Sequence, residues 1–265
     1  IILQIYIHMS DNVETKKIRL KEEKNRIAFQ TPTIIKLKYP HLQDSQLQKK
    51  ITLKKEFQTT HYDGTLKQLT KKDKSCKKSD FTLAPHQEFL KIYMSRHTPY
   101  NGLLLYHGMG SGKTCSAISI CEEYRKYNKH NPGFKKILII ASPNVQENFK
   151  LQLFDKSKLI QKNGIWYLDG CVGESLLQEM KFFDIERLSK EDIISKMEKQ
   201  IKKHYEFMGY VEFANKINKV FLLEDKKQMK KMKQLLKQEF SEKMVVVDEV
   251  HNIRTLGETK KTKQV

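Results

Sequence analysis

The stretch Gly108–Thr114 contains the residue types that bind phosphate. Its glycines allow a tight turn whose backbone N–H groups point at an anion, and a helix that begins near Lys113 would add the positive end of its dipole. The Lys113 amino group could reach the outer phosphates, and the Thr114 hydroxyl could bind Mg²⁺. His107 stands where the strict phosphate-loop pattern has its first glycine. The residues predicted to hold the phosphates are Gly108, Gly110, Ser111, Gly112, Lys113 and Thr114.

A second group of residues that could take part in catalysis follows the apolar run Met244–Val247. The run is short and rich in β-branched residues, which is typical of a buried parallel strand. Asp248 would then lie at the carboxyl end of a strand, where open α/β sheets bind ligands, and could hold a Mg²⁺ ion that bridges phosphates. Glu249 could orient and deprotonate an attacking water. Alone, such a pair would more readily be an acidic turn, but the upstream glycine-rich loop favours a catalytic pair.

Apolar strands and amphipathic helices must bring these groups to one place. Continuous apolar runs predict the strands, and apolar residues three or four positions apart predict the helices. The predicted elements are a helix from Pro85 to about Arg96, strand Gly102–Tyr106, helix Lys113–Tyr127, strand Lys136–Ala141, strand 164–168 and the strand before Asp248. This order indicates an α/β fold with a doubly wound, mostly parallel sheet. Trp166 is expected in the core.

The segment from about Glu174 to Glu242 is expected to be a mostly helical, basic insertion before the last strand. Ser189 and Asp192 fit the start of one of its helices. Lys226–Lys233 predicts an amphipathic helix with a lysine face. That face could meet nucleic acid, but a solvated face is the preferred interpretation.

Gly110–Thr114 and Asp248–His251 resemble motifs I and II of the superfamily 2 helicases and nucleic-acid-dependent ATPases, the second in its Asp-Glu-x-His form. Longer phrases resemble the helicase-like ATPases of large cytoplasmic DNA viruses. That group includes the poxvirus nucleoside triphosphatase I and early transcription factor small subunit, with similar proteins in giant viruses and African swine fever virus. The phrases are Leu83–Leu90, Leu103–Gly108, Thr114–Ile120, Glu147–Lys150 with Phe154 and Asp155, Tyr205–Tyr210 and Val247–Arg254.

This resemblance implies a P-loop, RecA-like ATP-binding domain that uses ATP and Mg²⁺. Lys113 would hold the phosphates, and Thr114 and Asp248 would hold the metal ion. Glu249 would activate water. His251 would couple the nucleotide site to a neighbouring domain.

Two further sites follow from the same resemblance. Gln87 would read the adenine edge, because an amide offers both a donor and an acceptor; the competing interpretation is a surface glutamine on a helix. Ser142, Pro143 and Asn144 resemble motif Ia, which contacts the sugar–phosphate backbone of the bound strand. Asn144 with Glu147 also fits a helix N-cap and its partner, and both roles can coexist.

The composition fits an anionic partner. The formal net charge is +19, which indicates nucleic acid first and a membrane surface second. No apolar run approaches the roughly 18 residues that a membrane-spanning helix needs. Ile1–Ile7 is too short for a signal peptide and has no basic flank, and Met9 is a plausible start that would leave residues 1–8 upstream.

The four cysteines have no metal-binding spacing. Cys76, Cys115, Cys121 and Cys171 are therefore expected to be reduced thiols, forming neither a zinc site nor a disulfide framework.

The chain divides by charge near residue 80. Residues 1–80 contain 18 Lys and Arg against 9 Asp and Glu, which predicts a basic N-terminal extension that is partly irregular or disordered. Residues 81–265 would be the first RecA-like domain. No second domain with an arginine finger is recognisable, so we expect the N-terminal portion of a longer enzyme. Alone, it should bind nucleotide weakly and hydrolyse it slowly, since such an arginine is worth ~10³–10⁵ in rate.

The sequence therefore predicts an ATPase that moves along or remodels nucleic acid, in viral transcription. Its expected partners are DNA or RNA and the viral RNA polymerase or transcription factors, with no membrane, and its expected location is the virion or the viral factory in the host cytoplasm. Two alternatives stay open: a phosphate-loop phosphotransferase, and a non-enzymatic nucleotide-binding subunit of a transcription complex.

Overall fold

The computed structural model describes residues 2–7, 39–61, 83–95, 97–108, 110–168, 170–171, 175–180, 188–221 and 226–252. The strands are β1 (Ile2–Ile7), β2 (Gly102–Tyr106), β3 (Ile137–Ile140), β4 (Leu159–Lys162), β5 (Ile165–Leu168), β6 (Tyr205–Met208) and β7 (Met244–Asp248). The helices are α2 (Leu47–Thr52), α3 (Lys55–Gln58), α4 (Pro85–Tyr93), α5 (Lys113–Asn128), α6 (Pro143–Leu153), α7 (Ser175–Met180), α8 (Lys190–His204), α9 (Tyr210–Phe221) and α10 (Lys226–Phe240), with 3-10 turns η2 (Lys156–Lys158) and η5 (Val250–Asn252).

Five strands form the main sheet, in the order β2-β1-β7-β3-β6. Strand β3 pairs in parallel with β6 and β7, whereas β1 pairs antiparallel with β2 and β7. Because β2 and β7 both run opposite to β1, all the strands of this sheet except β1 point in one direction. The fold is α/β with a parallel sheet of three strands. The strands predicted near 102–106, 136–141 and 244–247 are confirmed.

Strand β1 is the unexpected member of the sheet. The sequence analysis set residues 1–8 apart from the fold, but Ile2–Ile7 lies between β2 and β7. Leu3 pairs with Leu105 on one side and with Asp248 on the other. The expectation of a mostly parallel sheet is therefore corrected at one position, where the antiparallel strand β1 separates β2 from β7.

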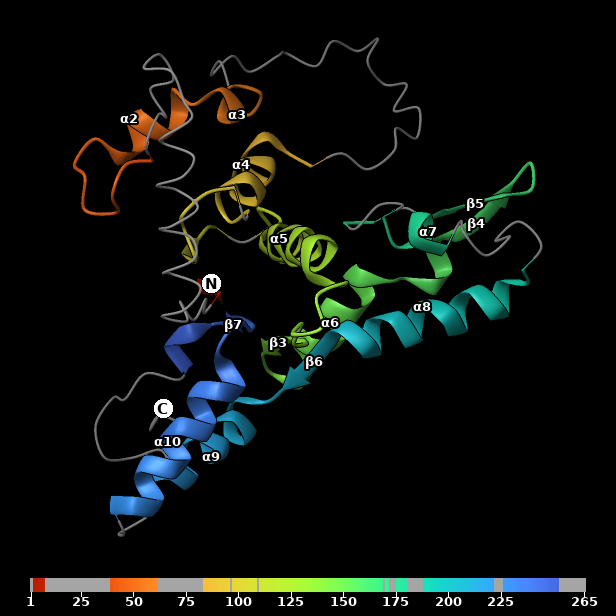
Figure 1. Ribbon diagram of the computed structural model, residues 1–265. Helices are drawn as coiled ribbons and strands as arrows, with labels where there is room; N and C mark the ends of the chain where they lie inside the picture. Colours follow the sequence, from red (N-terminus) through yellow and green to blue (C-terminus); the bar gives the residue numbers. More distant parts are fainter. Residues whose placement is uncertain are drawn as a thin grey trace, which may run out of the picture.

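Helices cover both faces of the sheet. On one face, α4, α5 and α6 pack on a core that includes Ile118, Ile139 and Val246. On the other face, residues of α9 and of the end of α10 pack against the core around Ile140 and Met208. Figure 1 shows α9 and α10 side by side, projecting away from α4 and α5. Burial on both faces explains why β3 reads as a continuous apolar run.

The predicted helical insertion contains a strand that the sequence analysis missed. Residues Tyr205–Met208 follow α8 directly and pair with β3 as strand β6. Two other parts of the prediction are confirmed: Ser189 caps α8 by accepting a hydrogen bond from the Asp192 amide, 3.1 Å away, and α10 follows as a lysine-rich helix.

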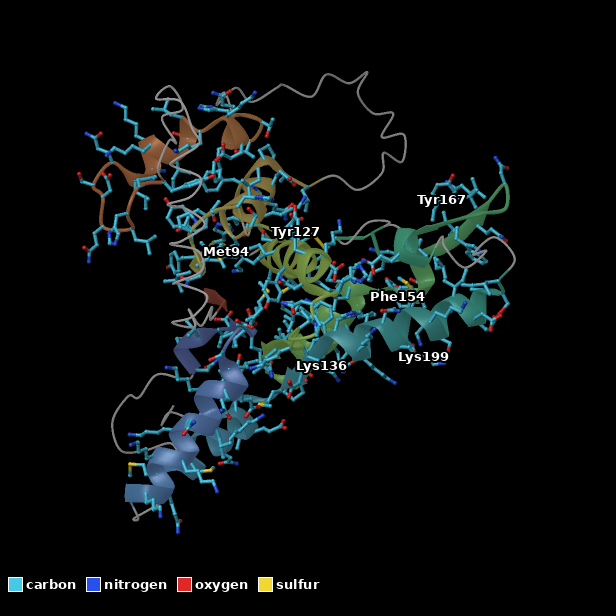
Figure 2. The ribbon with its side chains drawn as sticks, in the orientation of Figure 1. Met94, Tyr127, Lys136, Phe154, Tyr167 and Lys199 are labelled. Atoms are coloured by element: carbon cyan, nitrogen blue, oxygen red, sulfur yellow. A yellow bond between two sulfur atoms is a disulfide. The ribbon has the colours of Figure 1, made fainter. Side chains whose placement is uncertain are left out.

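The strand predicted at 164–168 is confirmed as β5, but it lies outside the main sheet. It pairs only with β4 in a two-stranded sheet. Trp166 is 9% exposed in a small core with residues of α7 and α8, so the core interpretation is confirmed. Figure 2 shows Tyr167 on this hairpin, far from the α9–α10 pair.

A buried ion-pair network joins α5, α7 and β6. The Arg125 side chain is fully buried and forms hydrogen bonds to the carboxylates of Glu122 and Glu179 at 2.6–2.9 Å. The Tyr205 hydroxyl donates a 2.6 Å hydrogen bond to Glu122. Each charge therefore has several partners, which buried charges require.

The expectation about the cysteines is partly wrong. Cys115 and Cys171 form a disulfide with their Cα atoms 5.2 Å apart, whereas Cys121 is free and buried. The two bonded residues lie 56 positions apart, on segments that only the folded chain brings together, so their spacing gave no signal.

Part of the chain before residue 81 packs on a segment that lies after it. Ile51 of α2 and Phe57 of α3 share a small core with Tyr100, whose hydroxyl donates to the Pro40 carbonyl at 2.8 Å. The boundary at residue 81 stays a prediction, and the basic stretch 71–78 lies outside the described residues. Among the described residues, no helix has the length and apolar character to cross a bilayer.

Candidate nucleotide-binding site

The glycine-rich loop joins the end of β2 to the start of α5. Gly110 and Gly112 have φ values of +77° and +78°, which is the left-handed conformation that glycine adopts without strain. The Ser111 hydroxyl donates to the Gly108 carbonyl at 2.9 Å and closes the turn. Met109 lies outside the described residues. Gly112 caps α5, so the first N–H groups of that helix face the loop without partners in the helix.

Lys113 is the first residue of α5 and points back into the loop. Its side chain is buried, with 8% exposed, and its Nζ donates to the His107 carbonyl at 3.0 Å. The residue that replaces the first glycine of the strict pattern thus contributes its backbone oxygen. Thr114 follows at the second position of the helix and is partly exposed. A buried amine beside the first N–H groups of a helix is an anion-binding arrangement.

Gln87 is not a surface residue, so that interpretation is wrong. It is 6% exposed, its Oε1 accepts from the Ala84 amide at 2.9 Å, and its Nε2 donates to the Gly112 carbonyl at 3.2 Å. It therefore holds the start of α4 against the start of α5. Because an amide has a second N–H and a second lone pair, a contact with adenine stays a prediction.

A histidine pair flanks the same loop. The rings of His86 and His107 meet edge to face with their centres 5.8 Å apart, and His86 Nε2 lies 3.3 Å from the Ser111 carbonyl. Burial, with help from nearby His86 and Lys113, lowers the pKa of His107. His107 is therefore neutral at physiological pH, so no second positive charge is buried next to Lys113.

Asp248 ends β7 at the edge of the sheet where β2 also ends. Leu105 and Asp248 both pair with Leu3 of β1, so they lie at one level with a single strand between them. At about 4.8 Å per strand spacing, the backbones of β2 and β7 are roughly 10 Å apart. The loop that follows β2 and the carboxylate that ends β7 therefore share one edge of the sheet.

The environment of Asp248 is unusual for a carboxylate. Its side chain is 8% exposed. Burial and, secondly, the neighbouring Glu249 raise its pKa, while Lys113 acts in the opposite direction. A buried acid whose charged form is disfavoured is a group that a bound cation would stabilise.

Glu249 and His251 form a pair beside Asp248. Glu249 has a φ of +46°, a conformation that is uncommon for residues with a side chain. His251 Nδ1 lies 3.2 Å from Glu249 Oε2. His251 is half exposed, whereas Glu249 is mostly covered. The predicted water-activating residue thus has a direct partner in the predicted coupling residue.

Tyr210 is a site residue to which the sequence analysis gave no role. Its hydroxyl donates to the Asp248 carbonyl at 2.7 Å. Burial raises the pKa of this hydroxyl, whereas hydrogen bonds with Asn252 and the Ser142 backbone act to lower it. Tyr210 therefore connects β3, β7 and η5 at the same edge. It lies in one of the phrases that resemble viral ATPases, which was the available signal.

Ser142, Pro143 and Asn144 follow β3 at this edge. The helix cap is Ser142, with Pro143 in the first turn of α6, so the prediction of Asn144 as the N-cap is wrong. Ser142 has extended backbone angles and no side-chain cap bond; instead Gln146 Nε2 donates to the Ala141 carbonyl at 2.8 Å. Pro143 and Asn144 are exposed, so a nucleic-acid strand could reach them.

The donor set fits a magnesium ion that is bound together with a nucleotide. Within the described ranges, no three His, Cys, Asp or Glu side chains group closely enough to hold a metal by themselves. Mg²⁺ commonly uses one or two protein oxygens and completes its shell with phosphates and water. Thr114 and Asp248 could supply those protein oxygens.

The chain is similar to helicase-like proteins of large DNA viruses. It is 28% identical over 180 residues to a protein of Acanthamoeba polyphaga mimivirus named "Putative ATP-dependent RNA helicase", covering 67% of this chain and 26% of that protein. It is 28% identical over 177 residues to a "Putative helicase" of Invertebrate iridescent virus 3, covering 64% of this chain and 15% of that protein. A helicase-named protein of Frog virus 3 is 22% identical over 173 residues.

The chain spans about a quarter or less of the length of these relatives. No family model matches it, and no solved structure does either. The relatives establish a likeness to viral helicase-like proteins, and the name of the mimivirus protein implies that this relative uses ATP.

Proposed function

We propose that this chain binds Mg²⁺-ATP at the shared edge of β2 and β7 and hydrolyses it to move along or remodel nucleic acid. One observation carries the proposal: the glycine-rich loop and Asp248 lie at the same sheet edge, because Leu105 before the loop and Asp248 both pair with Leu3 of β1. The names of the viral relatives support it.

Each residue of the site has a distinct role in this proposal. The first N–H groups of α5 and the Lys113 amine hold the phosphates. Thr114 and Asp248 hold Mg²⁺, which neutralises charge on the transferred phosphoryl group when bound. Glu249 accepts the proton of the attacking water. His251, bonded to Glu249, orients that carboxylate and relays the state of the site.

The remaining parts of the proposal rest on the resemblance. Residues 81–265 form the first RecA-like domain, and Ser142–Asn144 contact the sugar–phosphate backbone. The same resemblance suggests a role in the transcription machinery of a virus, with polymerase or transcription factors as partners in the viral factory.

The test compares two single-charge deletions on α5. Lys113→Ala should abolish Mg²⁺-ATP binding, measured by calorimetry, whereas Lys126→Ala removes an exposed lysine of the same helix and should bind as the unmodified chain does. Unchanged binding by Lys113→Ala would contradict the site. Phosphate release is then measured with and without polynucleotide. Stimulation by polynucleotide favours the ATPase, phosphate transfer to a small molecule favours a phosphotransferase, and binding without turnover in the full-length protein favours a non-enzymatic subunit.

A further inference from the structure

Helix α10 has an unbalanced charge. It contains six lysines and one acidic residue, Glu239, and Glu239 forms an ion pair with Lys216 of α9. Lys230, Lys233 and Lys237 are exposed. Their i, i+3, i+7 spacing places them along one side of the helix. In the part of the chain that the structure describes, no carboxylate pairs with these three residues, which we call the lysine stripe.

The apolar side of α10 faces the protein. Phe240 packs edge to face on Phe213 of α9, with ring centres 6.0 Å apart, and Met229, Met232 and Leu236 are only partly exposed. A basic amphipathic helix that binds a membrane must insert its apolar side into the lipid. Here Phe240 is engaged with α9, and among the described residues Leu235, at 47% exposed, is the one large apolar side chain of α10 that is exposed, so the lysine stripe favours a partner that is recognised by charge.

We propose that the lysine stripe binds phosphates of a nucleic-acid strand, at a surface separate from Ser142–Asn144. Residues i and i+7 of a helix are about 10 Å apart, which is the axial length of roughly three nucleotides of one strand in a duplex. Lysines contact phosphates as point charges, so this surface adds affinity without sequence preference. The identity of the partner rests on the function proposed above.

The position of α10 connects this surface to the nucleotide site. Three residues separate the end of the helix from β7, the strand that carries Asp248. Lys135 from the segment before β3 donates to the carbonyls of Gln238 and Glu239, and the buried Lys243 is bonded to Glu206 at 2.8 Å. The end of α10 is therefore attached to the sheet, close in sequence to the strand that carries Asp248.

The test measures how binding of a labelled single-stranded oligonucleotide of about 20 nucleotides, longer than the ~16 that a single binding domain covers, changes with salt. The full chain is compared with the triple variant Lys230→Gln, Lys233→Gln, Lys237→Gln. The matched control is Lys199→Gln, Lys202→Gln, Lys203→Gln, which removes the same charge from exposed positions of α8; Figure 2 shows Lys199 well away from α10. Loss of three phosphate contacts should lower the slope of log affinity against log salt by about two.

The outcomes are distinct. A slope lowered by about two in the α10 variant, with the α8 control unchanged, supports the proposal, provided that circular dichroism and Mg²⁺-ATP binding match the unmodified chain. Equal slopes in both variants overturn it while leaving the nucleotide site intact. Variant-sensitive binding to anionic lipid vesicles, with oligonucleotide binding unaffected, overturns it in favour of a membrane. If the unmodified chain binds Mg²⁺-ATP but no oligonucleotide, the nucleic-acid part of both proposals fails.

Discussion

The Tyr210 hydroxyl donates a 2.7 Å hydrogen bond to the carbonyl oxygen of Asp248. This bond joins the first residue of α9 to the last residue of β7, just before Glu249 takes a positive φ of 46°. The backbone must turn here to direct two consecutive carboxylates differently. Tyr210 fixes the oxygen on one side of that turn and thereby the position of the Asp248 side chain.

Tyr210→Phe should therefore disturb the carboxylates without changing the volume of the core. Removing one partner of a buried hydrogen bond costs about 1 kcal/mol of unfolding free energy, measurable by urea unfolding. Mg²⁺-dependent ATP binding should weaken as well. Tyr106→Phe is the matched control, because Tyr106 precedes the loop but is 77% exposed. Wild-type stability and wild-type Mg²⁺ dependence in Tyr210→Phe would show that the bond has no positioning role.

Gly112→Ala tests the contact between the loop and Gln87. A Cβ atom at Gly112 would lie 2.6 Å from Gln87 Nε2, in a residue whose φ is +78°. Gly164 has a φ of +79° and nothing near its Cβ position, so Gly164→Ala measures the backbone cost alone. Gly112→Ala should cost about 1 kcal/mol more, the value of the Gln87 hydrogen bond that must break. Adding Gln87→Ala should not increase that cost further; a full additive loss would exclude the contact.

Asp248→Asn tests the pH dependence of folding. Because burial raises the pKa of Asp248 above its ordinary value of 3.8, the folded protein holds this proton longer than the unfolded chain does. Stability is therefore lost as the pH rises from about 3.8 through the raised pKa. Asp248→Asn removes this loss, so in the absence of nucleotide it should stabilise the protein more at neutral pH than at acidic pH.

Asp155→Asn should show the opposite dependence of stability on pH in the same series of unfolding measurements. Hydrogen bonds from the Ser157 hydroxyl and amide lower the pKa of Asp155, so its carboxylate stabilises the fold above the unfolded pKa and this is lost as the pH falls. The Asn variant should thus lose stability at neutral pH. The same direction of pH dependence for both variants would contradict the described environment of Asp248.

The elements around the site could be predicted because their signals are local. Strand Gly102–Tyr106 and the helix from Lys113 follow from an apolar run, glycines and helical spacing within a few residues. Asp248 was predicted correctly at the end of a strand, because a short run rich in β-branched residues favours a buried strand over a helix. In each case the sequence pattern and the tertiary structure require the same conformation.

The missed elements depend on pairing between distant residues. Strand β1 pairs with residues near 105 and 248, and no feature of the sequence Ile2–Ile7 predicts which strands it pairs with. Strand β6 continues directly from α8 with no turn residue between them, so only its pairing with β3 distinguishes it from helix. Gln87 was ambiguous for a similar reason: its hydrogen-bond partner, the Gly112 carbonyl, lies 25 residues away.

Arg125→Met tests the buried charge network that supports α5. The Arg125 side chain is 0% exposed and its partner Glu122 is 5% exposed, so removing the guanidinium leaves Glu122 and Glu179 without their main counter-charge. Breaking a buried pair in this way costs about 3–5 kcal/mol, and methionine keeps most of the side-chain volume. Lys150→Met, which removes the exposed partner of Glu147, should cost less than about 1 kcal/mol.

The network also predicts how the damage can be reversed. Because the cost of Arg125→Met comes from uncompensated carboxylates, adding Glu122→Gln should recover part of the stability: a neutral amide is less costly to bury and can still accept from the Tyr205 hydroxyl. Glu122→Gln alone should be destabilising, since Arg125 then keeps Glu179 as its main partner. Urea unfolding of the two single variants and the double variant measures this coupling. Strictly additive losses would mean that Arg125 contributes through packing and that its charge is not what the surrounding carboxylates require.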